Sequence, residues 1–393
     1  MSRRPQICFT FVGTVSRDSR LRRFARAAAA IADVSVLTLT DEPAATLHGV
    51  AIVSIPRGPS LRSALPRFWR MGADALPAGG ADALPAGGAD ALPAGGADLY
   101  IAADLYSLPL AARLAAAGSS GLIYDSRELY RAIAALEGRR LMQGFWSALE
   151  RRYARRAHAV LTVNDSIAEI LRAEFDDVRV LHNYPDAVED RASNGSNRLR
   201  EALGIPADQR ILLSQGGLQR GRGALLCVNA LAQVDAAALV FLGDGPLRDE
   251  ILLHARVHGV EDRVHVHPAV PSDELLSWTA GADVGLCMIE NLGRSYYLSL
   301  PNKLFEYMAA GLPVVGSDFP EIGRVLRASG AGIPVPADNP DALAESLRQL
   351  LADSARLEEL RQRSVDARTA YQWQSEETLF RSLLEEQLRK TAD

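Results

Sequence analysis

Short apolar runs alternate with amphipathic segments along the first half of the chain. The apolar runs include "QICFTF", "VSVLTL", "VAIVSI", "GLIYDS" and "AVLTV". Between them lie stretches with helical periodicity, such as "SRLRRFARAAAAIA". Strands that are apolar on both faces and alternate with helices are typical of a parallel sheet covered on both sides. The pattern therefore predicts a doubly wound α/β domain.

A polar stretch interrupts this alternation at residues 186–198. Its sequence, "DAVEDRASNGSNR", lacks periodicity and is typical of a linker. The alternation then restarts with "RILLSQGG" and "ALVFLGDG". We therefore expect two tandem doubly wound Rossmann-like domains, residues 1–187 and 188–370, that face a central cleft.

Three identical octapeptides, "GADALPAG", occupy residues 72–95. Each copy advances a helical wheel by about 80° beyond two full turns, so the repeated leucines share no face, and the repeated prolines interrupt any long helix. Copies this short bury too little apolar surface to form a solenoid. Because they precede a predicted strand, we interpret them as a surface insertion at the amino ends of the strands, opposite the cleft.

Composition limits the classes of function. The 393 residues are 48% hydrophobic and carry a net charge of −5, which fits an ordinary globular protein and gives no overall basic excess for nucleic acid. Three scattered cysteines show no metal-site spacing and fit a reducing compartment. No apolar run reaches the ~18 residues of a membrane span, and "MSRRPQICFTFVG" has no cleavage site. We expect a cytoplasmic protein without a cofactor.

Two stretches combine arginine with large aromatic residues. They are "LRSALPRFWRM" (residues 61–71) and "EGRRLMQGFWSALERRYARRAH" (residues 137–158). One interpretation is a solvated arginine face over a partly buried aromatic face. The other is a peripheral contact with an anionic membrane surface or a lipid-linked acceptor. The pattern alone leaves both open.

A glycine-rich loop follows the first predicted strand of the second half. This loop, Gly216–Gly223 ("GGLQRGRG"), opens a predicted helix and carries Arg220 and Arg222. Glycines let backbone N–H groups approach an anion, and a helix N-terminus adds positive potential. The loop matches neither a Walker loop nor a correctly placed G-x-G-x-x-G motif. A phosphate site and a tight turn with solvated arginines are therefore both open.

A second candidate loop lies in "YYLSLPNKLFEYMAAGLPVVGS", residues 296–317. Ser299 and Pro301 are typical helix-start residues, and Lys303 and Glu306 project from one face of the first turns. A cation beside a helix N-terminus suits a diphosphate, and a carboxylate one turn further suits ribose hydroxyls. The 43 basic residues include only two lysines, which favours a need for a compact point charge at Lys303. An ordinary i,i+3 ion pair is the alternative.

Several segments together resemble retaining glycosyltransferases of family 4, which have the GT-B fold. They are "PNKLFEYMAAGLPVVGSDFPEI", "VFLGDGPLRDEI", "QGGLQRGRG", "DRVHVHPAVPSDELLSWTAGADVGL", "VLHNYP", "SRDSRLRRFARAAAAI" and "LIYDSRELY". The resemblance covers nearly the whole chain. It implies an α/β fold of the GT-B type, no catalytic metal, and a last helix, residues 371–393, that packs back on the N-terminal domain.

The resemblance also assigns roles on the donor side. Arg222 matches the Lys of a Lys-Gly phosphate contact, and Glu306 matches the second Glu of E-x7-E, which contacts the donor ribose. Lys303 belongs to the Pro-x-Lys variant of that motif and should meet the diphosphate. These three are the catalytic candidates. The other donor-binding candidates are Gly216, Gly217, Arg220, His267, Ser299 and Leu300, of which His267 lies in the region that lines the base.

Two positions depart from the family pattern. The first Glu of E-x7-E is Leu298 here, so either backbone groups of residues 295–300 replace it or sugar recognition differs. The family's Asp-x-His-Glu is Asp125-Ser126-Arg127-Glu128, and Arg127 either binds an anionic group or pairs with Asp125 or Glu128. The acceptor-side candidates are Gly13, Arg20, Asp104, Asp125, Arg127 and Glu128.

Together these features predict transfer of a sugar from a nucleotide diphosphate sugar to a hydroxyl of a glycan, lipid-linked or small-molecule acceptor, with retention at the anomeric carbon. No His-x-His or Asp-x-Asp follows a predicted strand, and "GDG" at residues 243–245 fits a tight turn, so we expect a metal-independent enzyme. The alternatives are a nucleotide-sugar epimerase with the GT-B fold and a catalytically degenerate GT-B protein that binds a nucleotide sugar or a partner.

Overall fold

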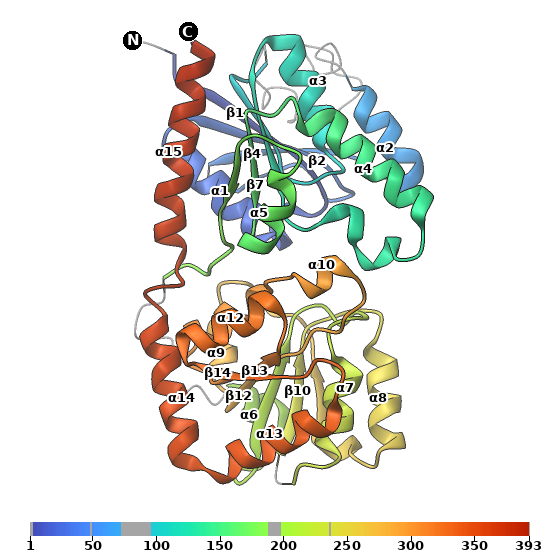
Figure 1. Cartoon of the computed structure of the whole chain (residues 1–393), viewed down its shortest axis with the longest axis vertical. Coiled ribbons are helices and arrows are strands. Elements are labelled where there is room, and N and C mark those ends of the chain that lie inside the picture. Colours follow the sequence, from blue (N-terminus) through green and yellow to red (C-terminus); the bar gives the residue numbers. More distant parts are fainter. Residues whose placement is uncertain (1–2, 48, 72–95, 188–197, 236, 393) are drawn as a thin grey trace. The chain divides into compact units, whose positions relative to one another are not determined.

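The computed structural model describes residues 3–47, 49–71, 96–187, 198–235 and 237–392. The octapeptide copies and most of the predicted linker therefore lie outside the described residues. The chain divides into two compact units (Figure 1). The first unit comprises residues 1–132, 138–182 and 375–393, and the second comprises residues 133–137 and 183–374.

An eight-stranded sheet forms the centre of the first unit, with the order β3-β4-β2-β1-β5-β6-β7-β8. Its strands are β1 (Gln6–Val12), β2 (Asp33–Leu39), β3 (Ala45–Leu47), β4 (Val50–Ile55), β5 (Leu99–Ala102), β6 (Gly121–Ser126), β7 (Ala159–Thr162) and β8 (Val178–Val180). All neighbours are parallel except β3 and β4. The apolar pattern missed β3, because this three-residue edge strand is largely exposed.

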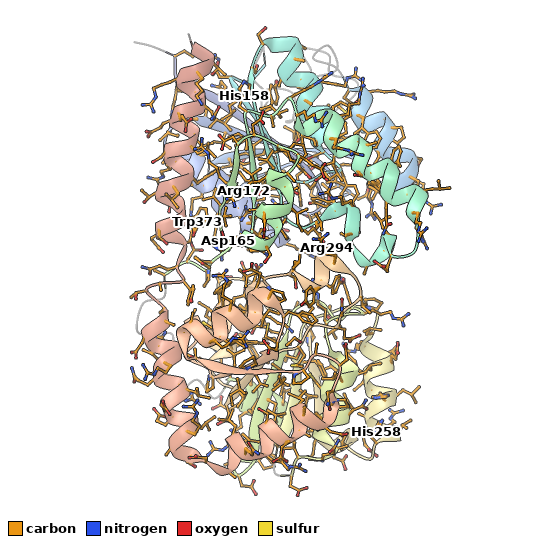
Figure 2. The ribbon with its side chains drawn as sticks, in the orientation of Figure 1. His158, Asp165, Arg172, His258, Arg294 and Trp373 are labelled. Carbon is orange, nitrogen blue, oxygen red and sulfur yellow. The ribbon has the colours of Figure 1, made fainter. Side chains whose placement is uncertain are left out.

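Helices cover both faces of this sheet, which is why β5, β6 and β7 are buried at every position. The helices are α1 (Ser19–Ala29), α2 (Leu61–Arg70), α3 (Leu108–Gly118), α4 (Arg140–Ala154), α5 (Asp165–Arg172) and the part of α15 (Trp373–Ala392) from Ser375 onward. Side-chain caps set two of the starts: Asp18 accepts from the N–H of Leu21 in α1, and Asn164 accepts from Ile167 in α5. Figure 2 labels Asp165 and Arg172, the two end residues of α5.

An aromatic stack and polar contacts attach the C-terminal helix α15 to the first unit. Phe380 stacks on Phe24 of α1 with ring centroids 4.1 Å apart, and both rings are buried. Nearby on the same helix, Glu376 accepts a hydrogen bond from the N–H of His182, and Glu386 pairs with Arg179. The stack supplies apolar burial, and the polar contacts fix the direction of the helix.

A six-stranded, fully parallel sheet forms the centre of the second unit, with the order β11-β10-β9-β12-β13-β14. Its strands are β9 (Arg210–Gln215), β10 (Ala237–Leu242), β11 (Val264–His267), β12 (Val284–Cys287), β13 (Val314–Ser317) and β14 (Gly332–Val335). Its helices are α6 (Arg198–Leu203), α7 (Ala224–Leu231), α8 (Arg248–Val257), α9 (Leu275–Thr279), α10 (Arg294–Tyr297), α11 (Asn302–Ala309), α12 (Pro320–Ser329), α13 (Pro340–Ala352) and α14 (Ser354–Ala367). Separate apolar clusters fill its two faces.

The strand order reverses between β1 and β5 in the first sheet and between β9 and β12 in the second. In such sheets the loops at the carboxyl ends of the strands beside the reversal form the binding crevice. The sequence-predicted loops lie there: Gly13 follows β1, Asp104 follows β5, and Gly216–Gly223 follows β9. The prediction of two doubly wound domains is confirmed. In the described part of the chain, every helix is too short or too polar to cross a bilayer.

The stack between α15 and α1 generates a stability prediction. Replacing Phe380 by Ala should lower the free energy of unfolding by about 3–5 kcal/mol, because it leaves a cavity under a buried ring. Leu379→Ala is the matched control: this neighbour is 59% exposed, and its replacement should change stability by less than about 0.5 kcal/mol. Urea denaturation followed by circular dichroism measures both, and equal effects would contradict the assignment.

Candidate functional site

The loops after β9 and β10 approach each other too closely for side chains. A Cβ on Gly243 would lie 2.1 Å from the Gly216 carbonyl oxygen, and a Cβ on Gly245 would lie 2.3 Å from that of Leu218. Backbone hydrogen bonds join the loops, from Gly216 N–H to Leu242 O and from Leu218 N–H to Asp244 O. The "GDG" turn is therefore the support of the glycine-rich loop. Gly216 and Gly217 themselves are exposed.

The end of the glycine-rich loop is fixed in the same way. A Cβ on Gly221 would lie 2.4 Å from the Tyr296 ring, and one on Gly223 would lie 2.6 Å from Met288 Cβ. The carboxylate of Glu290 accepts a hydrogen bond of 3.1 Å from the N–H of Gly223, the N-cap of α7. Glu290, which is out of register with the family motif, thus satisfies a donor at this helix start, and that N–H is not free for a phosphate.

The two arginines of the loop differ in setting. Arg220 is exposed. Arg222 is half-buried, and its guanidinium lies 5.6 Å from the centroid of the Tyr296 ring. The Tyr296 hydroxyl in turn donates to the Arg220 carbonyl oxygen at 3.4 Å. Tyr296 therefore contacts both the loop backbone and Arg222, and it holds the guanidinium at the loop that the resemblance assigns to phosphate.

Lys303 lies in the first turn of α11 and is only 7% exposed. Its ammonium forms no hydrogen bond or ion pair with any described residue, so the i,i+3 pair with Glu306 is not formed. The nearby thiols of Cys227 and Cys287 are neutral, because burial raises their pKa values to about 12 and about 11. Burial also lowers the pKa of Lys303, since it disfavours the charged form. A buried cation with no anion beside it is costly, and a bound anion would relieve that cost.

Glu306, one turn further along α11, is oriented by a residue that the sequence analysis missed. The Gln215 side chain donates to the Glu306 carboxylate at 2.6 Å and accepts from the Thr279 hydroxyl at 2.8 Å. The N–H of Gln215 is bonded to the Tyr307 hydroxyl. A polar residue directly after an apolar strand run was the available signal for Gln215. The network leaves the carboxylate half-buried with a defined orientation.

The start of α11 differs from the sequence expectation. Its N-cap is Pro301, which provides no side-chain acceptor, and the Ser299 hydroxyl instead donates to the Tyr296 carbonyl oxygen at 2.7 Å. Ser299 is therefore not a cap of this helix. Leu298, at the position of the family's first Glu, is 8% exposed, and Leu300 packs partly buried against the core. The first turn of α11 thus lacks a side-chain cap on its N–H groups.

His267 lies at the end of β11, in the third loop of this edge. Its ring is 4.5 Å from the Trp278 ring, and its Nδ1 is 2.8 Å from the Pro268 carbonyl oxygen. The N–H of Gly243 donates to the His267 carbonyl oxygen, which connects the β10 and β11 loops. The structure therefore places His267, the glycine-rich loop and its support on adjacent strand ends, because β9, β10 and β11 are neighbours.

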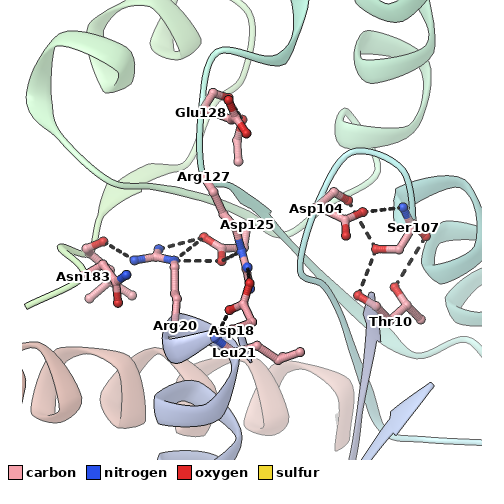
Figure 3. Close-up of polar contacts among 12 residues, drawn as sticks. Thr10, Asp18, Arg20, Leu21, Asp104, Ser107, Asp125, Arg127, Glu128 and Asn183 are labelled. Carbon is pink, nitrogen blue, oxygen red and sulfur yellow. Dashed lines mark hydrogen bonds and ion pairs between the residues drawn. The ribbon is translucent and has the colours of Figure 1, made fainter. Parts of the chain in front are cut away.

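In the first unit, Arg20 and Asp125 form a buried ion pair. Arg20 Nε and Nη2 donate to the Asp125 carboxylate at 2.9 and 2.7 Å (Figure 3). Its Nη1 donates to the Leu181 carbonyl oxygen at 2.7 Å. Arg20 is 3% exposed and Asp125 is fully buried. Such a pair holds α1, β6 and the segment after β8 together beneath the strand ends.

Arg127 takes part in the same network. Its Nε donates to Asp125 at 3.2 Å, and its Nη1 donates to Asp18, the N-cap of α1 (Figure 3). The charge of the two arginines is thus matched by Asp18 and Asp125, which favours the structural interpretation of Arg127 over an anion-binding role. The sequence analysis offered pairing of Arg127 with Asp125 or Glu128 as one alternative. The structure pairs Arg127 with Asp125 and, in addition, with Asp18. Glu128 is exposed at the surface.

Gly13 lines a cleft of about 420 Å³ at the carboxyl edge of the first sheet, and Asp104 is bonded to the backbone of Val12, another residue of its lining. Asp104 accepts from the N–H groups of Val12 and Ser107, at 2.8 and 2.6 Å, and burial raises its pKa to about 6. Gly13, whose φ is +148°, lines the cleft. Tyr106, from the expected acceptor loop at residues 104–107, lines it too. Residues that the sequence analysis missed also line it, and they include Thr40, Asp41, Glu42 and Arg57. Nothing in their local pattern marked them, since they come from separate strand ends.

Among the described residues, no group of three or more His, Cys, Asp or Glu side chains is arranged to hold a metal ion. The candidate charges at the second sheet are instead Arg222 and Lys303, and the candidate carboxylate is Glu306. The three catalytic candidates of the sequence analysis therefore lie in one unit, on α11 and on the loop that precedes α7.

Comparison with known proteins identifies the family. Residues 18–184 match the model of a "Glycosyl transferase 4-like domain", and residues 209–353 match that of "Glycosyl transferases group 1". The chain belongs to the family 4 type of glycosyltransferases, with the GT-B fold. Over 190 residues it is 29% identical to D-inositol 3-phosphate glycosyltransferase 1 from Catenulispora acidiphila. This match covers 45% of this chain and 44% of that one. The chain thus spans less than half the length of this curated relative.

Solved structures show the same fold. Sucrose-phosphate synthase from Thermosynechococcus elongatus superposes with a TM-score of 0.75 at 18% identity, covering 96% of this chain and 98% of that one. HepE from Anabaena in complex with UDP superposes with a TM-score of 0.71 at 15% identity, covering 97% of this chain and 100% of that one. At these identities the likeness supports the fold, and function requires a separate argument from the site.

The ammonium of Lys303, which is unpaired within the described part of the chain, generates a prediction on stability. Lys303→Met should raise the free energy of unfolding of the ligand-free protein by about 1–2 kcal/mol, because it removes a buried charge and keeps a similar volume. The other lysine provides the control: Lys390 is exposed and pairs with Glu386, so Lys390→Met should change stability by less than about 0.5 kcal/mol. Denaturant titration measures both, and destabilisation by Lys303→Met would show that the ammonium has a partner.

Proposed function

We propose that the chain transfers a sugar from a nucleotide diphosphate sugar to a hydroxyl group of an acceptor, with retention at the anomeric carbon. The observation that carries the proposal is the buried ammonium of Lys303 at the start of α11, which has no partner among the residues that the structure describes. An ammonium that is kept out of water without a carboxylate suits a ligand that brings its own negative charge. A diphosphate is such a ligand, and the resemblance assigns one to this position.

The same groups act in the chemical step. Cleavage of the bond between sugar and diphosphate leaves negative charge on the phosphate oxygens, and the sugar becomes oxocarbenium-like. Lys303, Arg222 and the uncapped first turn of α11 would stabilise that departing charge. Because Tyr296 contacts the guanidinium of Arg222 and burial confines Lys303, both cations are held in place before the donor binds.

The nucleoside is assigned to the neighbouring strand ends. Glu306, oriented by Gln215, would accept hydrogen bonds from the ribose hydroxyls. His267 and the backbone beside it would contact the base. Two solved neighbours, HepE with UDP and HepE with UDP and glucose, contain a uridine nucleotide, which makes UDP-sugars the first donors to test.

The proton of the acceptor hydroxyl would pass to the leaving phosphate oxygen on the same face of the sugar. This route requires no separate general base and accounts for retention. The charge that a divalent cation would otherwise neutralise is assigned to Lys303 and Arg222. We therefore propose a metal-independent reaction.

The acceptor is assigned to the cleft of the first unit. Its lining presents carboxylates from Asp41 and Glu42 and a guanidinium from Arg57, around the aromatic ring of Tyr106. Carboxylates and a guanidinium suit the hydroxyls of a sugar or polyol, and an aromatic ring suits its apolar face. A glycan, a lipid-linked sugar and a small polyol all present such groups.

One observation favours a second candidate function. Leu298 replaces the family's first Glu with a buried apolar side chain, so the donor sugar lacks one carboxylate contact. A protein that binds the nucleotide sugar without transferring it would tolerate this change. An epimerase would need several acid or base groups free to act on the sugar, and the carboxylates of Glu306 and Glu290 at this edge both accept hydrogen bonds from the protein.

A donor panel separates these functions. The purified protein is incubated with UDP-, GDP- and ADP-sugars, with and without cell extract as the acceptor source, in EDTA and in Mg²⁺. Released nucleotide together with a new glycoside of unchanged anomeric configuration, equal in EDTA and Mg²⁺, is the expected result. An isomeric nucleotide sugar would indicate epimerisation, and binding without turnover would indicate the degenerate protein.

Variants test the phosphate assignment. Lys303→Met and Arg222→Ala should each lower turnover by about 10²-fold or more, because each removes a charge that stabilises the departing diphosphate. Gln215→Ala should raise KM for the donor by about tenfold while Glu306 remains, since it only loosens that carboxylate. Lys390→Met is the control and should match the unaltered protein. Near-normal turnover in both charge variants would refute the phosphate assignment.

A further inference from the structure

Helix α4 exposes three large apolar side chains within five consecutive residues. Leu141 is 91% exposed, Met142 44% and Phe145 49%. These three are close together in the sequence, whereas the other exposed large apolar residues are scattered over α8, α10 and α15. We call these three side chains, with the arginines that border them, the α4 patch. Its arginines are Arg139, Arg140, Arg152, Arg155 and Arg156.

Several members of the patch share one side of the helix. Leu141 and Phe145 are four residues apart and therefore lie one above the other. Spacings of three and four residues continue this side of the helix through Ala148 to Arg152 and Arg155, and these positions are exposed as well. The outer face of α4 is thus apolar at its N-terminal half and basic at its C-terminal half. Figure 1 shows α4 beside α3 and α2 on the outer side of the first unit.

The positive charge of the patch is not compensated. Residues 139–156 contain six arginines and one acidic residue, Glu150. Glu150 is 1% exposed and bonded to the Tyr124 hydroxyl, so it faces the interior. Arg151 approaches Glu174 at 3.9 Å, and the five arginines of the α4 patch form no ion pair with the part of the chain that the structure describes.

Aromatic contacts connect the patch to the acceptor cleft. The Trp146 ring lies 5.3 Å from Phe145, 5.2 Å from Tyr106 and 6.4 Å from Trp69 of α2. The Trp69 indole N–H donates to the Tyr106 carbonyl oxygen at 2.7 Å. Tyr106 also lines the cleft of the first unit. The exposed apolar face and the proposed acceptor site are therefore joined by packed rings within one unit.

We propose that the α4 patch binds the surface of a membrane that contains anionic phospholipids. Apolar side chains that insert at the headgroup level, bordered by arginines of one sign, are the features that bind such a surface. A protein partner would have to present several acidic groups to pair with the five arginines, whereas an anionic lipid surface carries negative charge over its whole area. Binding would hold the acceptor cleft next to the lipid, which favours a lipid-linked acceptor. That last step rests on the proposed function, whereas membrane binding itself does not.

Vesicle sedimentation tests the proposal with the full chain. Vesicles of phosphatidylcholine alone are compared with vesicles of phosphatidylcholine mixed with phosphatidylglycerol. Partitioning to the anionic vesicles should be at least about tenfold stronger and should weaken as salt is raised, because several arginines contribute. Equal partitioning to both vesicle types, or none to either, would overturn the proposal.

Two double variants and one matched control locate the binding surface. Leu141→Ser with Phe145→Ser, and Arg152→Gln with Arg155→Gln, should each reduce partitioning by about tenfold. Leu253→Ser with Val257→Ser removes the exposed i,i+4 apolar pair of α8, where Asp249 and Glu250 accompany the basic residues, and should have no effect. Binding that survives both α4 variants would overturn the assignment.

Two further measurements separate loss of vesicle binding from unfolding, from loss of activity and from self-association. Thermal unfolding and nucleotide release from a soluble donor should be unchanged in the α4 variants, so that loss of vesicle binding is not loss of fold or of the proposed activity. Sedimentation without lipid examines self-association. Concentration-dependent dimers that disappear in the Leu141→Ser, Phe145→Ser variant, with no vesicle binding by the unaltered chain, would make the patch an interface between copies and overturn membrane binding.

Discussion

The close approach of two backbone loops determines the geometry of the candidate donor site. Gly243 and Gly245 lie against the carbonyl groups of Gly216 and Leu218 with no space for a side chain. Three adjacent strand-end loops are bonded to one another through this contact, because the N–H of Gly243 also reaches the His267 carbonyl. The path of the glycine-rich loop, and hence the start of α7, follows from this contact.

Charge at this edge is distributed for a ligand rather than for stability. Glu290 satisfies a donor at the start of α7, and Gln215 holds Glu306, yet Lys303 is buried without a partner among the described residues. A structure selected only for stability would pair that ammonium or replace it. Uncompensated burial of one charge within a well-satisfied polar network is the expected feature of a binding site, where stability is lost to gain function.

The first unit shows the opposite arrangement. Arg20 and Arg127 share Asp125 and Asp18, so a network of four charges is internally matched (Figure 3). The sequence alone marked Arg127 as a departure from its family and left its role open, because pairing depends on which residues the fold brings together. Asp18 lies 109 residues away along the chain, at the start of α1. On α4, by contrast, five arginines form no ion pair with any described residue.

The amino-acid sequence by itself determined the two parallel sheets, because strands that are buried on both faces must be apolar throughout. It also marked the glycine-rich loop, Lys303 and Glu306, since glycine, a rare lysine and helical spacing are visible locally. The tertiary structure alone decided their partners. Gln215 meets Glu306 across 91 residues and Gly223 meets Glu290 across 67, and the acceptor cleft collects residues from separate strand ends. Such contacts depend on the order of strands in the sheet, which periodicity along the chain does not encode.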